Sequence, residues 1–263
     1  MILFTYFFNY VNIYVIYEVY IKKIDYENII FIDNKNDYVS GSFGTIKRCK
    51  YDKNIYAYKE FNDSNYMNNK IKKIELIREI KINGLLGPEF WVQKNYDLSY
   101  LSSFIQSQNI NYYKNFPAKE KIKLLNKIKN LILTMHENNI IHTDLHNGNI
   151  IIDDNLNPYI IDFDNCSYKK YKTKINDAND YSQEFIKKYG IIPEIDIFMF
   201  NLLTYSFLKQ INYYNARIDI LSNNTNNFKN NDSKRILDSL FLEDNYPNKD
   251  FLIDTIDENT FKI

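Results

Sequence analysis

The segment IIHTDLHNGNIII, residues 140–152, constrains the fold more than any other part of the chain. Apolar residues of the kind that form strands lie on both sides of two histidines, an aspartate and two asparagines. A buried strand gains nothing from so many polar groups, because each of them needs a hydrogen-bond partner away from water. A loop held between two apolar anchors can use the same groups for chemistry. The segment therefore predicts a functional loop.

The overall composition is that of an ordinary globular protein. The 263 residues are 45% hydrophobic and 25% charged, and the formal net charge is zero. This length can bury a core as one large domain or as two small lobes. The balance of charge provides no field that favours nucleic acid or a membrane surface, so we expect no nucleic-acid partner. The protein is expected to be a monomer. Two cysteines, Cys49 and Cys166, form no disulfide framework and indicate the cytoplasm, or the host cytoplasm if the chain is viral.

The first 21 residues are apolar enough to be compared with a membrane span, which needs about 20 residues. Asn9, Asn12 and Glu18 interrupt this run, which also lacks the basic start and the small-residue cleavage site of a signal peptide. We expect residues 1–25 to be an apolar extension, either a helix packed on the domain or an artefactual stretch. A membrane anchor is the alternative.

The first half of the chain is rich in predicted strands. A helix is expected over residues 69–83, where isoleucines recur on one side and Gly84 ends the pattern. A polar, asparagine-rich linker is expected after the last of these strands. The predicted strands are residues 27–32, 45–51, 54–61 and 90–93.

The second half is predicted to be mainly helical. A long helix is expected over residues 118–137, opened by Pro117, and a helix at residues 196–208 is apolar nearly all round and hence buried. A strand is expected at 157–163, and 222–233 is a low-complexity loop. The fold class is thus α+β with two lobes and a ligand cleft between them. The lobe boundaries are expected at residues 26–95 for the small β-rich N-lobe and 96–263 for the larger helical C-lobe.

Three polar side chains are spaced for phosphoryl transfer. Asn149 follows Asp144 by five positions, and Asp162 stands thirteen residues later at the end of a strand pattern. A carboxylate in that position is costly unless it is paired or bound to a metal. The short tether between the two apolar runs would form a hairpin and bring the three side chains together. Asn149 and Asp162 would then hold Mg²⁺, and Asp144 would act on the substrate hydroxyl.

On these residues the chain resembles the eukaryotic-like protein kinase superfamily. HTDLHNGN resembles the catalytic loop, and DFD resembles the magnesium-binding triplet with Asp164 in place of the usual glycine. The DLHxGN form is similar to the loops of haspin-type kinases and of small-molecule kinases such as choline and aminoglycoside phosphotransferases. The resemblance covers roughly residues 26–210. It implies a two-lobed kinase-like fold with a reduced C-lobe, and ATP and Mg²⁺ as cofactors.

Upstream segments resemble the parts of a kinase that hold the nucleotide. VSGSFGTIKRC resembles the glycine-rich phosphate loop, although Val39 replaces its first glycine and a surface hairpin would look similar. Lys59 resembles the lysine that holds the α- and β-phosphates; a solvent-facing lysine on an edge strand is the alternative. Glu79 resembles the helix glutamate that pairs with this lysine, with Glu75 one turn earlier as the alternative. In the phosphate loop the resemblance implies nucleotide contacts from Gly41, Ser42, Gly44 and Ile46.

The segment 91–104 resembles the hinge and the start of the next helix. Asp97 in this segment would contact the ribose, or alternatively cap that helix. Asp196 resembles the aspartate that braces the catalytic loop, and His142 is expected to be a packed structural residue. Asp164 is expected either to strengthen metal binding or to face solvent.

Two departures from the family pattern concern charge. Thr143 replaces the arginine that pairs with a phosphorylated activation loop, so activity is expected not to depend on that modification despite Tyr171 and Thr173. His146 replaces the lysine that helps neutralise the transferred phosphoryl group, and it is expected to act beside Asp144.

The expected function is that of an ATP-dependent Ser/Thr protein kinase that acts on a hydroxyl side chain of a protein. The glycine loop, the helix glutamate and the buried helix favour this branch of the superfamily. A small-molecule kinase acting on choline, sugars or aminoglycosides is the first alternative, suggested by DLHNGN and DFD. A nucleotide-binding pseudokinase that serves as a binding module is the second, suggested by Val39, Thr143, His146 and Asp164.

Overall fold

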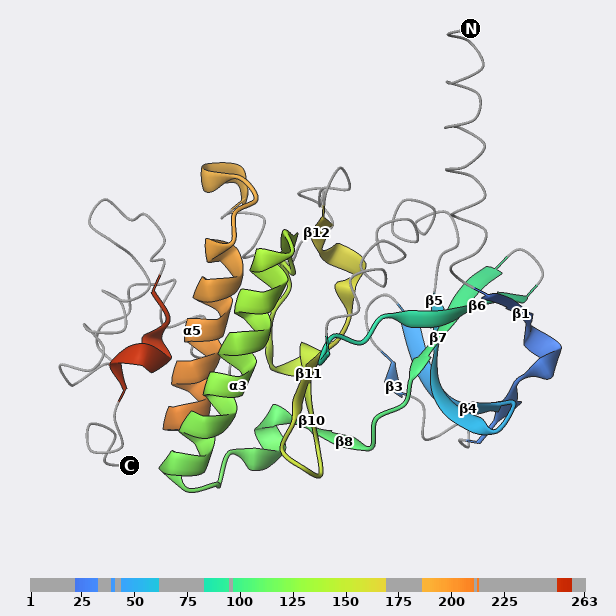
Figure 1. The fold of residues 1–263 in the computed structure, drawn as a ribbon, viewed down its shortest axis with the longest axis horizontal. Helices are drawn as coiled ribbons and strands as arrows, with labels where there is room; N and C mark the ends of the chain where they lie inside the picture. The colour runs from blue at the N-terminus through green and yellow to red at the C-terminus, as the bar shows by residue number, and fades with distance from the viewer. Residues whose placement is uncertain are drawn as a thin grey trace, which may run out of the picture. The chain divides into compact units, whose positions relative to one another are not determined.

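The chain folds into two compact units in the computed structural model. The N-terminal unit comprises residues 1–79 and 86–105, and the C-terminal unit comprises residues 80–85 and 106–263. The structure describes residues 22–32, 39–40, 44–61, 83–94, 97–168, 186–210, 212 and 250–256 (Figure 1).

The N-terminal unit is a curled seven-stranded sheet. Its strand order is β1-β6-β7-β5-β4-β2, and β3 also pairs with β4. The pairs are antiparallel except that β1 runs parallel to β6. The strands are β1 (Lys22–Asp25), β2 (Ile30–Phe31), β3 (Val39–Ser40), β4 (Gly44–Tyr51), β5 (Asn54–Phe61), β6 (Pro88–Lys94) and β7 (Asp97–Ser103).

Alternation along the central strands of this sheet builds its core. Tyr58 on β5 and its partner Leu101 on β7 are both fully buried. The Tyr58 hydroxyl donates to Ser99 Oγ at 3.0 Å, and burial raises the pKa of this phenol. The ring of Phe31 meets the Tyr58 ring edge-on, with 5.1 Å between centroids. The expected strands at 45–51 and 54–61 are confirmed by β4 and β5.

Several expectations for residues 22–113 differ from the structure. Strand β1 lies before residue 26, inside the stretch assigned to the extension. Residues 97–103 form strand β7, so the expected start of a helix there was wrong. The expected linker contains strand β8 (Ser107–Asn109) and the 3-10 helix η3 (Ile110–Tyr113). Strand β7 pairs with β6 and β5 along its two edges. The consecutive residues Ser99, Tyr100 and Leu101, which face opposite sides of the sheet, are all buried, so the strand shows no clear alternation. The N-terminal unit ends at Ile105, and residues 80–85 belong to the C-terminal unit.

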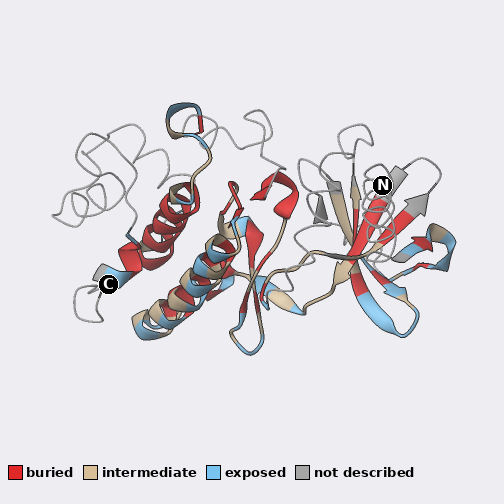
Figure 2. Ribbon diagram, turned by 45° about the horizontal axis from the view of Figure 1, so that its top comes forward, coloured by how far each residue is buried: buried red, intermediate tan, exposed pale blue. Residues whose placement is uncertain are grey.

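The C-terminal unit contains two long helices and two small sheets. Strand β10 pairs with β11 and β8, and β12 pairs with β9. The predicted helix at 118–137 is confirmed at both ends, and the predicted buried helix lies within α5 (Figure 2). The elements are β8 (Ser107–Asn109), η3 (Ile110–Tyr113), α3 (Ala118–Glu137), β9 (Ile140–Ile141), η4 (Asn147–Asn149), β10 (Ile150–Asp153), β11 (Pro158–Ile160), η5 (Phe163–Asn165), β12 (Ser167–Tyr168), α5 (Glu194–Lys209) and η9 (Leu252–Thr255).

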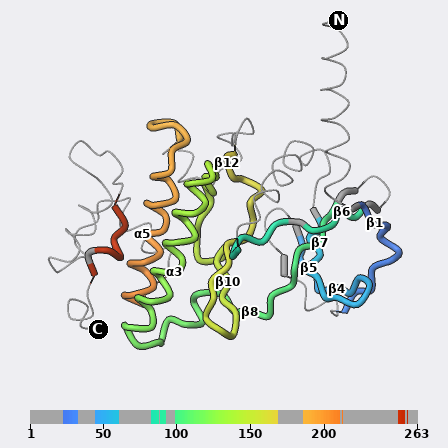
Figure 3. Tube along the Cα trace, viewed as in Figure 1, coloured from blue at the N-terminus to red at the C-terminus, as the bar shows by residue number. Residues whose placement is uncertain are grey.

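Helices α3 and α5 lie side by side in antiparallel orientation (Figure 3), and polar contacts join them at both ends. Near the end of α3, His136 lies 3.0 Å from Asp196 in the first turn of α5. Near the start of α3, Lys121 is fully buried and its ammonium donates to the Phe207 carbonyl oxygen at 3.4 Å. Burial lowers the pKa of Lys121, while the last carbonyls of α5 provide the partial negative charge that a cation prefers.

Several predicted segments lie outside the described residues. They include residues 1–21, most of the helix expected at 69–83, and the loop at 222–233. Within the part of the chain that the structure describes, no helix is both long enough and apolar enough to cross a membrane.

Candidate active site

The loop at 142–149 is held by the two small sheets of the C-terminal unit. It begins directly after β9, which pairs with β12, and it leads into β10, which pairs with β11. The connection from β11 to β12, residues 161–166, therefore runs beside it. Ile140, Ile150 and Ile152 at the two ends of the loop are fully buried. These strands are the apolar anchors that the sequence predicted.

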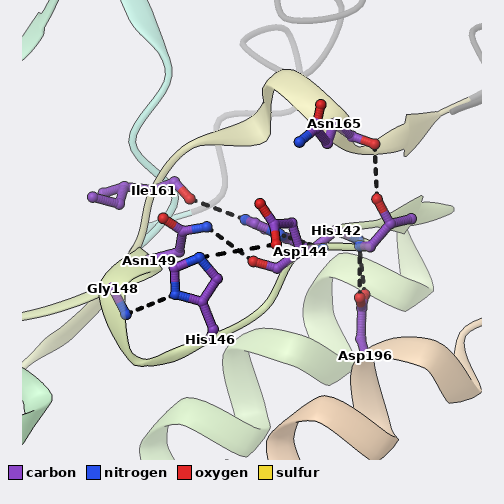
Figure 4. Close-up of polar contacts among 9 residues, drawn as sticks. His142, Asp144, His146, Gly148, Asn149, Ile161, Asn165 and Asp196 are labelled. Atoms are coloured by element: carbon purple, nitrogen blue, oxygen red, sulfur yellow. Dashed lines mark hydrogen bonds and ion pairs between the residues drawn. The ribbon is translucent and has the colours of Figure 1, made fainter. Parts of the chain in front are cut away.

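One buried carboxylate, that of Asp196, fixes the start of the loop (Figure 4). Its Oδ2 accepts the backbone N–H of His142 at 2.8 Å, and its Oδ1 accepts that of Thr143 at 2.8 Å. The His136 ring nitrogen Nε2 lies 3.0 Å from Oδ2. Hydrogen bonds to a charged acceptor are strong, so these three donors offset the cost of burying the carboxylate. The expected bracing role of Asp196 is what the geometry provides.

His142 links the loop to the neighbouring connection. Its Nε2 lies 2.9 Å from the Ile161 carbonyl oxygen, while its Nδ1 accepts the Asp144 backbone N–H at 3.3 Å. These two contacts fit a neutral ring with its proton on Nε2, because a carbonyl needs a donor. The ring also packs against Phe163, with 5.1 Å between centroids. His142 is a packed structural residue, as expected.

Thr143 is held in a strained conformation. Its φ of 63° lies in the left-handed region, where a β-branched residue is an outlier. The Thr143 hydroxyl donates to the Asn165 carbonyl oxygen at 2.8 Å, and its N–H is bound by Asp196. The side chain is fully buried. The position that carries an arginine in the family pattern is therefore occupied by an alcohol turned into the protein.

Asn149 and Asp162 lie at the same end of the β10–β11 hairpin. Strand pairing of Ile150 with Ile160 continues one step further, where the Ile161 N–H donates to the Asn149 carbonyl oxygen at 3.0 Å. Asp162 is the next residue and adopts a left-handed φ of 65°. The Asn149 side-chain amide donates from Nδ2 to the Asp144 carbonyl oxygen at 2.9 Å. Asp144, Asn149 and Asp162 are thus brought together, as the sequence predicted for this part of the site.

This donor set fits a magnesium ion carried by a nucleotide. The Asn149 side-chain nitrogen donates to a carbonyl, so its oxygen is the end that could ligate a metal, and Asp162 adds a carboxylate. Mg²⁺ uses hard oxygen ligands and takes few of them from protein when phosphates supply the rest. The described residues contain no group of three or more histidines, cysteines or carboxylates that could hold a metal by themselves. An amide oxygen and one carboxylate would fit a metal that takes its other ligands from phosphate.

His146 sits over Gly148 and points toward Asp144. Its Nδ1 accepts the Gly148 N–H at 2.9 Å, so the ring proton belongs on Nε2, which lies 3.9 Å from Asp144 Oδ1. A Cβ at position 148 would come within 2.6 Å of the ring, so this packing requires glycine. Burial lowers the pKa of His146, the neighbouring His142 lowers it further, and the charges of Asp144 and Asp162 raise it in part. The site therefore holds a neutral N–H donor beside Asp144.

Lys59 belongs to a central strand of the N-terminal unit. Strand β5 lies between β4 and β7, where Lys59 pairs with Ile46 on one side and with Tyr100 on the other. Its side chain is only 7% exposed, and its ammonium lies 6.0 Å from the centre of the Tyr100 ring. The alternative of a solvent-facing lysine on an edge strand is therefore wrong. Two predicted nucleotide contacts, Lys59 and Ile46, are direct neighbours across the sheet.

Of the remaining predicted site residues, the structure corrects some expectations, and several residues lie outside the described part of the chain. Asp164 is 2% exposed, so the alternative that it faces solvent is wrong. Asp97 opens β7, so the helix cap was wrong, while its contact with a ribose stays a prediction. Gly44 opens β4. Gly41, Ser42, Glu75 and Glu79 lie outside the described residues.

Sequence reasoning missed His136, the third donor to Asp196. It lies in the last turn of α3, shortly before the loop that it helps to hold. The sequence did place His136 at the end of a helix with a clear apolar periodicity, close to the loop. Only the packing of α3 against α5 shows that its partner is the Asp196 carboxylate.

Comparison with protein-family models gives a match to the protein kinase domain over residues 39–258. This range includes every residue of the loop, the hairpin and α5. A search of curated proteins gave no match to the chain.

Gly148→Ala is expected to displace the His146 ring while the fold is retained. The added Cβ would meet only the far end of the imidazole, which can rotate away. The rate of phosphate transfer should fall by as much as in His146→Ala, on the order of a hundredfold if the ring supplies a donor to the reacting groups. Steady-state kinetics and the NMR signals of the ring would measure both effects. The double variant is the control, and an additive loss would contradict the steric explanation.

Acidification is expected to destabilise the wild type more than His146→Gln. The unfolded chain has a histidine pKa of about 6.5, whereas burial holds the folded pKa of His146 lower. The unfolded state therefore binds more protons below pH ~6.5, and stability is lost as the pH falls from there through the folded pKa. Urea unfolding of both proteins from pH 8 to pH 5 would measure this. A difference between them that stays constant across the range would contradict the assignment.

Proposed function

Because the chain belongs to the protein kinase family, and is thus a kinase phosphotransferase, we propose that it transfers the γ-phosphate of ATP to a Ser or Thr hydroxyl of a protein. The observation that carries the proposal is the grouping of Asp144, Asn149 and Asp162 around one end of the β10–β11 hairpin, with the loop fixed from below by Asp196. The glycine-rich segment and the lysine on a central strand support ATP as the donor.

Each residue would have a distinct role. Asp144 would orient the attacking hydroxyl and accept its proton. Asn149 and Asp162 would hold Mg²⁺, which when bound neutralises phosphate charge. Lys59, positioned by Glu79, would hold the α- and β-phosphates. Backbone amides of the segment containing Gly41, Ser42 and Gly44 would cover the phosphates, and Asp97 would contact the ribose.

His146 would supply a hydrogen bond in this scheme. Its neutral Nε2–H is directed to the side of Asp144, where it could hold the carboxylate in position or donate to the transferred phosphoryl group. A neutral donor stabilises developing charge less than an ammonium does, so more of the neutralisation falls to Lys59 and the metal.

A small-molecule kinase is the second candidate. The loop has the DLHxGN form that resembles the loops of choline and aminoglycoside kinases, and the glycine of this form is the residue on which His146 packs here. The two candidate functions would use the same residues to bind ATP. They differ in whether the hydroxyl that binds beside Asp144 belongs to a protein or to a small molecule. A non-catalytic binding module is the third possibility that the assays below would detect.

The full-length protein should bind ATP in a magnesium-dependent manner. ATP at a hundredfold excess over its dissociation constant should add about 2.7 kcal/mol of apparent stability in a thermal-shift assay with Mg²⁺. Asp162→Asn should lose the magnesium-dependent part and lower phosphate transfer by a factor on the order of 10²–10³. Asp154→Asn, at an exposed carboxylate in the same hairpin, is the matched control.

Acceptor assays would then separate the candidates. Transfer to a generic Ser/Thr protein substrate supports the proposal, while transfer only to choline, a sugar or an aminoglycoside supports the second candidate. If wild type and Asp162→Asn are equally silent on all acceptors, the chain is a binding module and the proposal fails.

Phosphatase treatment is expected to leave the rate of phosphate transfer unchanged within about twofold. The reason is that Thr143 offers a buried hydroxyl, already bound to Asn165, where a loop phosphate would need a cation. The rate should be measured before and after complete dephosphorylation, confirmed by mass spectrometry. A tenfold or greater loss would show that another cation replaces the missing arginine.

A further inference from the structure

Residues 250–256, which we call the latch, lie against α5 in the C-terminal unit (Figure 1). Three successive apolar side chains of the latch are buried. Phe251, Leu252 and Ile253 are 5%, 4% and 3% exposed. The latch ends in the short helix η9, which contacts both α3 and α5.

A single buried side chain on α5 binds the latch backbone. Asn201 is fully buried, and its Nδ2 donates to the Asp250 carbonyl oxygen at 3.0 Å. Its Oδ1 accepts the Leu252 N–H at 2.8 Å. One amide thereby satisfies the backbone groups on both sides of Phe251. Without Asn201 these two groups would lose the partner that offsets their burial.

Side chains of both α3 and α5 also contact the side chains of the latch. The Phe251 ring lies 5.7 Å from the Phe200 ring of α5, and the Lys129 ammonium of α3 lies 5.5 Å from the Phe251 ring centre. Lys129 also forms an ion pair with Asp254 of the latch. The latch is therefore attached to α3 and to α5 at the same time.

The helix that the latch holds also carries the brace of the catalytic loop. Phe200 lies one turn after Asp196 on α5, and Asn201 follows it. The two hydrogen bonds that Asp196 accepts from the loop amides are both 2.8 Å long, and a small shift of α5 would lengthen them. Contacts that fix the middle of α5 therefore also fix the position of the Asp196 carboxylate.

We propose that the latch is a positioning device for the catalytic loop, with Asn201 as its central positioning residue. By binding the backbone on both sides of Phe251, Asn201 fixes α5 against α3 and keeps Asp196 in register with the His142 and Thr143 amides. The consequence for phosphate transfer rests on the proposed function, whereas the consequence for the loop amides does not.

Hydrogen exchange of the full-length protein tests the proposal directly. Asn201→Leu has a similar volume and lacks both hydrogen bonds. It should speed exchange of the His142 and Thr143 amides at least tenfold relative to the amide of Ile128, a fully buried residue in the middle of α3. A tenfold change corresponds to about 1.4 kcal/mol of local stability. The ratio to Ile128 removes any uniform loss of global stability.

Ser206→Ala is the matched control on the same helix. Ser206 is buried and its hydroxyl donates to Leu203 in its own helix, away from the latch. This variant should leave the ratio unchanged. If Asn201→Leu changes the ratio no more than Ser206→Ala does, the proposal is overturned.

A charge exchange tests the latch without altering a buried amide. Lys129→Glu places like charges beside Asp254 and should speed loop exchange, and addition of Asp254→Lys should restore protection by re-forming the ion pair. The same variants should lower kcat and leave KM for ATP unchanged. If the variants show faster loop exchange but neither they nor the wild type transfer phosphate to any acceptor, the latch is supported and the proposed function is refuted. Unchanged loop exchange in Lys129→Glu would overturn the latch.

Discussion

The carboxylate of Asp196 is the constraint on which the candidate site depends. It is fully buried, and it is tolerable there only because two backbone amides and one histidine donate to it. Those same hydrogen bonds fix the first residues of the loop and hold Thr143 in a conformation that it would otherwise avoid. One set of hydrogen bonds therefore offsets both the cost of burying the Asp196 charge and the backbone strain at Thr143. Without these hydrogen bonds, neither the buried charge nor the strained backbone would be stable.

The position of this carboxylate is determined by contacts along the whole of α5. At its N-terminal end His136 of α3 binds Asp196, near its C-terminal end Lys121 of α3 binds the Phe207 carbonyl, and between them Asn201 binds the latch. Each of these contacts is polar and is surrounded by apolar side chains. Apolar packing alone would allow α3 and α5 to slide, whereas a directional contact at each end allows only one alignment.

The sequence predicted the parts of the fold that follow from local pattern. The helix at 118–137 has a clear apolar face, and the loop at 142–149 combines a spacing and a residue set that few other sites need. Strand β7 was missed because side chains on both of its faces are buried, as at Ser99, Tyr100 and Leu101, so its sequence shows no alternation. His136 and Asn201 were missed because each acts on residues far away in the sequence, and no local signal states which distant backbone group or carboxylate a polar side chain will meet.

The described part of the site places neutral groups at two positions where the family pattern has cations. Thr143 donates an alcohol proton to a carbonyl, and His146 is held neutral because its Nδ1 already accepts the Gly148 N–H. A protonated His146 would have to break that contact and would carry its charge into a partly buried position. The loop itself thus orients groups by hydrogen bonds and contributes little positive charge. In the proposed phosphate-transfer reaction, Lys59 and a divalent ion would then supply the charge neutralisation, and the loop would contribute alignment.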